Sequence, residues 1–166
     1  TPRLMKFSQV VTRKMVGGTC QVSVLLSTLM GGVSGSAVAD ATMEARILGP
    51  EMTRRGYPKG YSSAVLCLTS LITATIPPSL GLILYGFIGN VSIGRLFIAG
   101  LIPGVLMCLV LMLTVWWTSK RYHYDVPDPA VSAPTGKEIA ASAKECFFAL
   151  VFPVLLIVLI RMGLCT

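Results

Sequence analysis

The sequence predicts an all-α membrane protein, a multi-span helical bundle that contains a re-entrant helical hairpin and a proline-broken transmembrane helix. Three observations lead to this fold class. Hydrophobic residues make up 54% of the chain and charged residues only 13%, whereas soluble proteins carry about 25% charged residues. Several apolar stretches are long enough to cross a bilayer. One of these stretches is interrupted by a polar tip and another by a pair of prolines.

The distribution of charge sets the class of partner. The formal net charge is +7, which in a soluble protein would favour nucleic acid as a partner. The basic residues here lie at the ends of apolar stretches, where they determine orientation in a membrane. They are Arg3, Lys6, Arg13, Lys14, Arg54, Arg55, Lys59, Lys120, Arg121, Lys137 and Lys144. We therefore expect a lipid bilayer as the partner, and no nucleic acid.

The reactive side chains point to no enzyme. The five cysteines are far apart and form no CxxC pair, and the single histidine, His123, lies in a polar region. A zinc or redox site is therefore not expected, and no nucleophile–base pair is visible. The chain begins at Thr1 and stops within a hydrophobic run at Thr166. We expect a fragment of a longer polypeptide, with no signal peptide at its start.

Residues 1–14 are predicted to be a basic segment on the cytoplasmic side, and residues 15–53 a re-entrant hairpin. Met15–Val33 has no charge and is about long enough to cross a bilayer. The polar tip Ser34–Asp40 follows, and then a shorter helical piece, Ala41–Met52. Both ends of the hairpin are basic, which places both in the cytoplasm. A polar tip at membrane depth must be buried in protein or line a wet cavity.

Residues 60–90 are predicted to form a discontinuous transmembrane helix. They contain no charged residue and are too many for a simple crossing. Pro77 and Pro78 interrupt them, because proline lacks an N–H and disfavours a helical conformation in the residue before it. We expect two half-helices, about Ser62–Thr75 and Ser79–Phe87, with an open joint between them.

The remaining segments complete a multi-pass topology. Residues 95–118 are predicted to be a transmembrane helix that ends in an aromatic and basic belt on the cytoplasmic side. Residues 119–145 are predicted to be a cytoplasmic loop and an amphipathic helix, which a capping box of Thr135 and Glu138 begins. Residues 146–166 are predicted to start a last transmembrane helix.

A polar tip beside a proline break is suited to a substrate and ion site at the membrane midplane. Half-helix N-termini direct N–H groups at anions, and unwound carbonyls with hydroxyls replace the water shell of a cation such as Na⁺. These hard oxygen donors suit a small hard cation. The candidates are Ser34, Gly35, Ser36 and Ala37 from the tip, and Thr73, Thr75 and Ser79 from the joint. The alternatives are a plain loop at the tip and a structural kink at the prolines.

Three charged residues of the hairpin need separate interpretations. A carboxylate at the bilayer centre is costly, about 2.5–3.5 kcal/mol on insertion scales. Asp40 either neutralises a cation or carries a proton, or it caps the helix that starts at Ala41; we favour capping, and the two roles can coexist. Glu44 and Arg46 are expected to pair with each other or with a neighbouring helix. Arg46 as a clamp for a substrate carboxylate is the alternative.

Several motifs resemble one family of transporters. The segments Gly32–Asp40, Ile47–Met52 and Arg55–Tyr57 resemble the hairpin of the DctM-like large permease subunit of tripartite ATP-independent periplasmic (TRAP) transporters. Later segments resemble the same family in the same order, namely Ile76–Ser79, Tyr85–Gly86, Val91–Gly94 and Ala99–Gly104. The resemblance covers Met15–Tyr122 well and the remainder loosely. It implies a fragment of the N-terminal half of that subunit.

The resemblance implies a sodium-coupled importer of small organic anions, such as dicarboxylates, in the bacterial inner membrane. It implies an elevator-type mechanism, Na⁺ as coupling ion and no other cofactor. The implied partners are a small DctQ-like membrane subunit and a periplasmic substrate-binding protein. In the family the tip and the helix break line the sodium and substrate sites, which correspond here to Ser34, Gly35, Ser36, Pro77, Pro78 and Ser79. The Na⁺ ligands implied among them are Ser34, Gly35, Ser36 and Ser79.

Two features qualify the transport interpretation. Some family members have small or apolar residues at the positions of Glu44 and Arg46. A complete large subunit has further helices and a second hairpin, so the chain alone is not expected to transport. The alternatives are another ion-coupled carrier without a binding protein, and a membrane scaffold subunit without a substrate. Sodium rather than proton coupling is favoured partly because Asp40 and Glu44 are the only titratable groups expected to be buried.

Overall fold

The computed structural model describes residues 2–125 and 135–147, together with residues 151, 155, 158, 159 and 162. All secondary structure in this part of the chain is α-helical, as predicted. The helices are α1 (Pro2–Thr12), α2 (Gly18–Gly31), α3 (Ala37–Ile47), α4 (Gly49–Arg54), α5 (Lys59–Thr75), α6 (Leu80–Ile88), α7 (Ile93–Tyr122) and α8 (Gly136–Glu145). The predicted loop residues 126–134 and most of the predicted last crossing, 146–166, lie outside the described residues.

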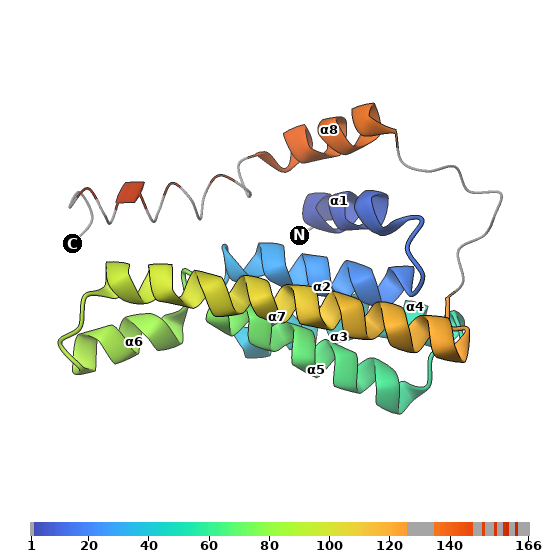
Figure 1. The fold of residues 1–166 in the computed structure, drawn as a ribbon, viewed down its shortest axis with the longest axis horizontal. Helices are drawn as coiled ribbons and strands as arrows, with labels where there is room; N and C mark the ends of the chain where they lie inside the picture. The colour runs from blue at the N-terminus through green and yellow to red at the C-terminus, as the bar shows by residue number, and fades with distance from the viewer. Residues whose placement is uncertain are drawn as a thin grey trace.

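Helix α2 occupies the centre of the bundle. It contacts α1, α5 and α7 along its length, and α3 and α4 more locally. Figure 1 shows α2 and α7 side by side, with α1 on the other side of α2 and α8 beyond α1. Because α2 is surrounded, its polar residues are buried as completely as its apolar ones. Gln21, Ser23 and Ser27 are fully buried, like Val24 and Leu26.

Helix α1 was not predicted, because the basic residues of 1–14 indicated only a membrane orientation. Its buried side chains are Leu4, Ser8 and Thr12, which share one face at a spacing of four residues. Two of the three are polar, so no apolar stripe marks the helix in the sequence. Packing against α2 and α8 holds it in place.

Helix α8 packs on α1 through exposed ion pairs. Lys6 Nζ lies 3.2 Å from Glu145 Oε2, and Arg13 Nη1 lies 3.5 Å from Glu138 Oε2. Exposed pairs of this kind contribute about 0–1 kcal/mol each. The predicted capping box of Thr135 and Glu138 is present at the start of α8 and is confirmed.

Helix α7 is long and apolar enough to cross a membrane. It has 30 residues, with a mean hydropathy of 2.7 over its most apolar window. Helices α5 and α6 meet the same criterion when taken together, and they are bent by 45° at the break between them. Many large apolar side chains of α6 and α7 are exposed, among them Leu80, Leu84, Phe87, Ile88, Ile102, Leu106, Leu109 and Leu113. Such a face suits lipid or further helices.

The hairpin region differs from the prediction in its helix boundaries. The first helix runs from Gly18 to Gly31 rather than over Met15–Val33, and Gly17 precedes it with φ +76°. The second begins at Ala37 and is divided at Leu48, so that α4 is separate. Pro50 explains the division, because it has no N–H to continue the hydrogen-bond ladder of α3.

Asp40 does not cap a helix, which contradicts the favoured prediction. The N-cap is Ser36, whose backbone is extended, and Asp40 lies within the first turn of α3. The Asp40 N–H already donates to the Ser36 carbonyl at 3.1 Å. An N-cap residue stands outside the helix, so Asp40 has no role as a cap.

Candidate ion-binding site

The two irregular stretches of the fold are in contact. We call residues 32–36, between α2 and α3, the tip loop, and residues 76–79, between α5 and α6, the joint. Gly35 has φ +60°, and a Cβ atom added there would fall on the carbonyl oxygen of Pro78. Only glycine allows this backbone conformation without strain and this close an approach. The tip loop therefore lies directly against the joint.

Close packing continues at Gly31, the residue directly before the tip loop. A Cβ atom on Gly31 would lie 3.2 Å from the Cα of Thr73 and 3.0 Å from the Cβ of Ile76. Helix α7 closes the joint from another side, because a Cβ on Gly100 would lie 2.9 Å from the carbonyl oxygen of Thr75. Gly104 contacts the side chain of Ile76 in the same way. The joint is thus enclosed by α2, α7 and the tip loop.

Four helix ends are brought together by these contacts. Helices α2 and α5 end here with their carbonyl groups, and α3 and α6 begin here with their N–H groups. The N-cap residues of α3 and α6 are Ser36 and Ser79, and within the described residues neither side chain forms a capping hydrogen bond. The first N–H groups of both helices consequently lack a side-chain acceptor. The junction offers positive helix ends to an anion and carbonyl oxygens to a cation.

The predicted ligands of the tip loop and joint lie at this junction. The hydroxyl oxygen of Ser34 is buried and has no hydrogen-bond partner in the described part of the chain. Ser79 is 2% exposed. The carbonyls of Ser36 and Ser79 each accept the first hydrogen bond of a helix, from Asp40 and Ile83, both at 3.1 Å. Ala37 is the first residue of α3, and a cis peptide bond joins Pro77 and Pro78.

Asp40 and Thr73 extend the junction into the bundle. The Thr73 hydroxyl lies 2.5 Å from Asp40 Oδ2 and 3.0 Å from the carbonyl oxygen of Ser27. Asp40 is 1% exposed, and its Oδ1 has no partner among the described residues. A buried acceptor of this kind is one that a bound cation or a proton would satisfy.

Thr75 is the predicted site residue whose side chain points away from the junction. Its hydroxyl donates to the Leu71 carbonyl of its own helix at 2.9 Å, and it contacts Met107 of α7. The break in α5 comes after Thr75. Its hydroxyl is therefore still on a regular helical turn, and the neighbouring surface is that of α7.

Glu44 has partners that the sequence analysis did not identify. It is fully buried and lies within hydrogen-bond distance of the hydroxyls of Ser23, Ser27 and Thr69, at 2.5, 2.7 and 3.2 Å. Arg46 is exposed and forms no ion pair in the described part of the chain. The expected Glu44–Arg46 pair is therefore wrong. Contact with neighbouring helices, the alternative, is confirmed for Glu44, but no ion pair of Arg46 is found among the described residues.

The spacing of polar residues along α2, α3 and α5 is a sequence signal for these partners. The polar residues occur as three pairs at a spacing of four, Ser23 and Ser27 on α2, Asp40 and Glu44 on α3, and Thr69 and Thr73 on α5. Residues at this spacing lie on one face of a helix. We call these six residues the polar seam, because each helix turns its pair toward the other two.

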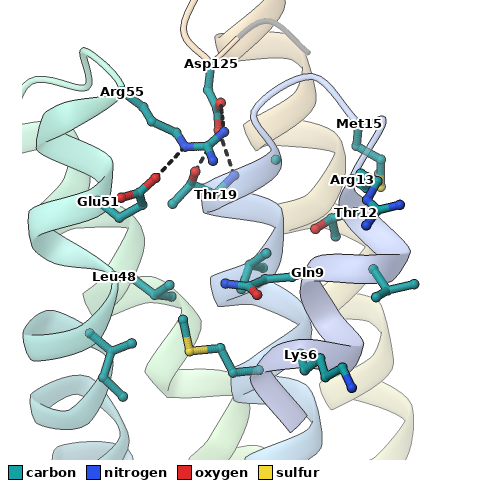
Figure 2. A pocket seen from close by; sticks show the side chains of 15 residues that line it. Lys6, Gln9, Thr12, Arg13, Met15, Thr19, Leu48, Glu51, Arg55 and Asp125 are labelled. Atoms are coloured by element: carbon teal, nitrogen blue, oxygen red, sulfur yellow. Dashed lines mark hydrogen bonds and ion pairs between the residues drawn. The ribbon is translucent and has the colours of Figure 1, made fainter. Parts of the chain in front are cut away.

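At the opposite end of α2, a second polar cluster joins three segments of the chain. Asp125, after α7, accepts hydrogen bonds from the backbone N–H and the hydroxyl of Thr19, both at 2.8 Å. Arg55 donates to Asp125 at 2.7 Å and to Glu51 at 2.9 Å. Figure 2 shows Arg55 between these two carboxylates and Asp125 above the start of α2. We call Thr19, Glu51, Arg55 and Asp125 the Asp125 cluster.

Electrostatics strengthens the Asp125 cluster. Burial alone would raise the pKa of the Asp125 carboxyl, but the hydrogen bonds from Thr19 and Arg55 outweigh it and hold that pKa below its usual value. Hydrogen bonds to Asp125 and Glu51 raise the pKa of Arg55. The cluster borders a cavity of about 790 Å³ between α1, α2 and α4. In the sequence, Arg55 was a topology signal and part of the Arg55–Tyr57 motif, neither of which predicts its partners, and Asp125 gave no signal.

The family that the sequence motifs resemble is also the family that known proteins with similar sequences belong to. The family model of the tripartite ATP-independent periplasmic transporter, DctM component, matches residues 1–166. The 2,3-diketo-L-gulonate TRAP transporter large permease protein YiaN of Escherichia coli is 37% identical over 150 residues, which are 90% of this chain and 34% of that protein.

Two further relatives carry other substrate names. The sialic acid TRAP transporter permease protein SiaT of Haemophilus influenzae is 35% identical over 157 residues, which are 95% of this chain and 25% of SiaT. The C4-dicarboxylate TRAP transporter large permease protein DctM of Pseudomonas aeruginosa is 29% identical over 155 residues, 93% of this chain and 35% of DctM. This chain thus spans about a quarter to two fifths of the length of the curated relatives it matches.

Proposed function

We propose, because this chain belongs to the DctM component family of tripartite ATP-independent periplasmic transporters, that it forms the sodium- and substrate-binding part of a large membrane permease. The family is one of membrane transporters and not of enzymes. Within it, the whole protein would import a small organic anion together with Na⁺. It would work in the bacterial inner membrane, where α5 and α6 form one discontinuous span and α2 and α3 a re-entrant hairpin.

The contact between Gly35 and Pro78 carries this proposal. It joins two stretches of non-helical backbone far apart in the sequence, and such backbone is tolerated at membrane depth only inside protein or beside a wet cavity. The unpartnered oxygens of Ser34 and Asp40 lie in the same region. We assign Na⁺ to the oxygens of Ser34, Gly35, Ser36 and Ser79. Asp40 and Thr73 lie next to this site, on the side toward the interior of the bundle.

The uncapped starts of α3 and α6 support an anionic substrate. Their N–H groups and their dipoles favour negative charge at the junction. The three relatives above are named for 2,3-diketo-L-gulonate, sialic acid and C4-dicarboxylates, which are organic acids. We propose a carboxylate substrate, delivered by a periplasmic binding protein. We also propose a small DctQ-like membrane subunit as partner and an elevator-type movement of the hairpin.

The test is sodium-dependent uptake by the full-length protein, reconstituted with its small subunit and its binding protein and supplied with a panel of carboxylates. Ser34→Ala, Ser36→Ala and Ser79→Ala are expected to weaken the dependence on sodium. Thr42→Ala is the matched control, because the Thr42 hydroxyl is exposed and bonds only within α3. Unchanged uptake in all three serine variants would support a scaffold role instead. Uptake without the binding protein would support another ion-coupled carrier.

A further inference from the structure

Glu44 lies in the polar seam but is separate from the proposed sodium ligands. It contacts Ser23 and Ser27 of α2 and Thr69 of α5, whereas the sodium ligands belong to the tip loop and the joint. Its side chain is 0% exposed. The proposed function gives Glu44 no task, and a fully buried carboxyl requires a physical explanation.

Among the residues that the structure describes, no cation pairs with Glu44 to balance its charge. The acids that form ion pairs in the described part of the chain are Glu51, Asp125, Glu138 and Glu145. Helices α2 and α5 face Glu44 with hydroxyls, and the charged Glu51 and Arg54 of α4 pair with each other. Asp40, one turn earlier on α3, is the titratable group that acts on Glu44, and its charge has the same sign. An ionised, unpaired carboxylate in this position is strongly unfavourable.

The hydrogen bonds around Glu44 outnumber the hydroxyl protons. Ser23, Ser27 and Thr69 have one hydroxyl proton each. Five contacts need a proton: three to Glu44, one between Ser23 and Thr69 at 3.0 Å, and one from Thr69 to the Leu66 carbonyl at 3.1 Å. With an ionised Glu44, three protons serve only three of these contacts.

A proton on Glu44 Oε2 makes the arrangement a continuous chain. Glu44 then donates to Ser23, Ser23 donates to Thr69, and Thr69 donates to the Leu66 carbonyl. Ser27 donates to the other carboxyl oxygen of Glu44 at 2.7 Å. Four contacts are satisfied in this way, and the one that remains, from Thr69 to Glu44, is the longest of the five at 3.2 Å.

We propose that Glu44 is a proton-binding site of the permease, occupied when the hairpin packs on α5. Opening of the seam to water would release the proton to solvent, and closing would require its return. The protonation itself is independent of the proposed function, whereas its effect on transport rests on it. Because the packed form needs a neutral Glu44, uptake is expected to fall as pH rises through the titration of this group.

Infrared difference spectroscopy of the purified full-length protein tests the protonation without transport. At neutral pH, Glu44→Gln is expected to remove a carbonyl band of a protonated carboxyl group. Glu145→Gln is the matched control, because Glu145 is half exposed and paired with Lys6, and it is expected to remove only a carboxylate band. Loss of a carboxylate band in Glu44→Gln would overturn the proposal. Should that variant not fold, Ser23→Ala is expected to shift the protonated band, and an unshifted band would be contrary evidence.

Uptake measured against pH tests the role in transport. The neutral Glu44→Gln is expected to keep wild-type uptake below neutral pH and to lose the decline at alkaline pH. Glu145→Gln should keep the wild-type profile. An inactive, folded Glu44→Gln beside an active Glu44→Asp would show that the charge is needed and would refute the proposal. Absence of any carboxylate uptake by the wild type, with the infrared band present, would refute the proposed function alone.

Discussion

The polar groups at the two ends of α2 differ: those at its start have hydrogen-bond partners, and some of those at its end do not. At its start, Thr19 donates a hydrogen bond to the carboxylate of Asp125, which lies outside the helix and is itself paired with Arg55. At its end, Ser34 Oγ of the tip loop and Asp40 Oδ1 of α3 have no partners in the described part of the chain. Polar groups that satisfy one another fix a position, whereas buried groups without partners suit a ligand. We infer that the start of α2 is an anchor and that the tip loop is where the proposed ion and substrate would bind.

The largest effect is expected at Gly35, and it tests the contact itself. Gly35→Ala would add a Cβ in a left-handed conformation, at about 1–2 kcal/mol, and against the Pro78 carbonyl. We expect loss of sodium-dependent uptake and a lower melting temperature. Gly49→Ala is the control, because a Cβ on Gly49 would meet no atom of the described residues within 4 Å. Equal behaviour of the two variants would show that the tip loop does not need to touch the joint.

The second-largest effect is expected at Thr73, and Thr75 of the same helix provides the comparison. Thr73→Val removes the hydroxyl that lies 2.5 Å from Asp40, and a hydrogen bond to a charged group is worth about 1.5–3 kcal/mol. We expect a weaker dependence of uptake on sodium, by about tenfold or more on this scale. Thr75→Val should leave sodium dependence unchanged, since the Thr75 hydroxyl bonds within its own helix. A larger loss of sodium dependence in Thr75→Val than in Thr73→Val would contradict this comparison.

A smaller effect is expected at the anchored end. Asp125→Asn keeps the shape of the side chain but weakens its bonds to Arg55 and Thr19. Because Arg55 is half exposed, solvent screens the pair, and we expect a loss of about 1–2 kcal/mol in unfolding free energy. Chemical denaturation measures it, with the exposed Glu138→Gln as control. The sodium dependence of uptake should not change. A large change would mean that the two ends of α2 do not act independently.

The smallest effect is the pH dependence of the same cluster. The pKa of Asp125 is lower in the folded protein than in the unfolded chain. Its contribution to stability is therefore complete above the ordinary aspartate pKa of about 3.9 and is lost as pH falls through the lower folded value. We expect wild-type melting temperatures to approach those of Asp125→Asn in acid. A constant difference down to the lowest pH at which the protein stays folded would contradict this assignment.

The sequence predicted those elements that depend on strong local signals. Pro77 and Pro78 lie where α5 ends and α6 begins, and charge-free stretches lie where α5, α6 and α7 are found. The motif from Gly32 to Asp40 pointed to the family that the comparisons show. These signals act within a few residues, so no knowledge of the tertiary structure was needed.

The sequence did not predict features that depend on packing between helices. Asp40 was expected to cap a helix because its type suits a cap, but Ser36 takes that position and leaves Asp40 facing Thr73. Helix α1 is buried through Leu4 and two polar residues, which give no hydrophobic period. Asp125 meets Thr19 across more than a hundred residues. Local patterns carry no information on such pairs.

Helix α7 runs from the joint to the Asp125 cluster. It abuts the joint through Gly100 and ends at Tyr122, just before Asp125. The 22 residue-to-residue steps from Gly100 to Tyr122 span about 33 Å at a rise of about 1.5 Å per residue. A tilt of about 5° around the Asp125 end would displace Gly100 by about 3 Å, more than the diameter of a sodium ion. A small tilt at the Asp125 end of α7 would therefore change the width of the joint at long range.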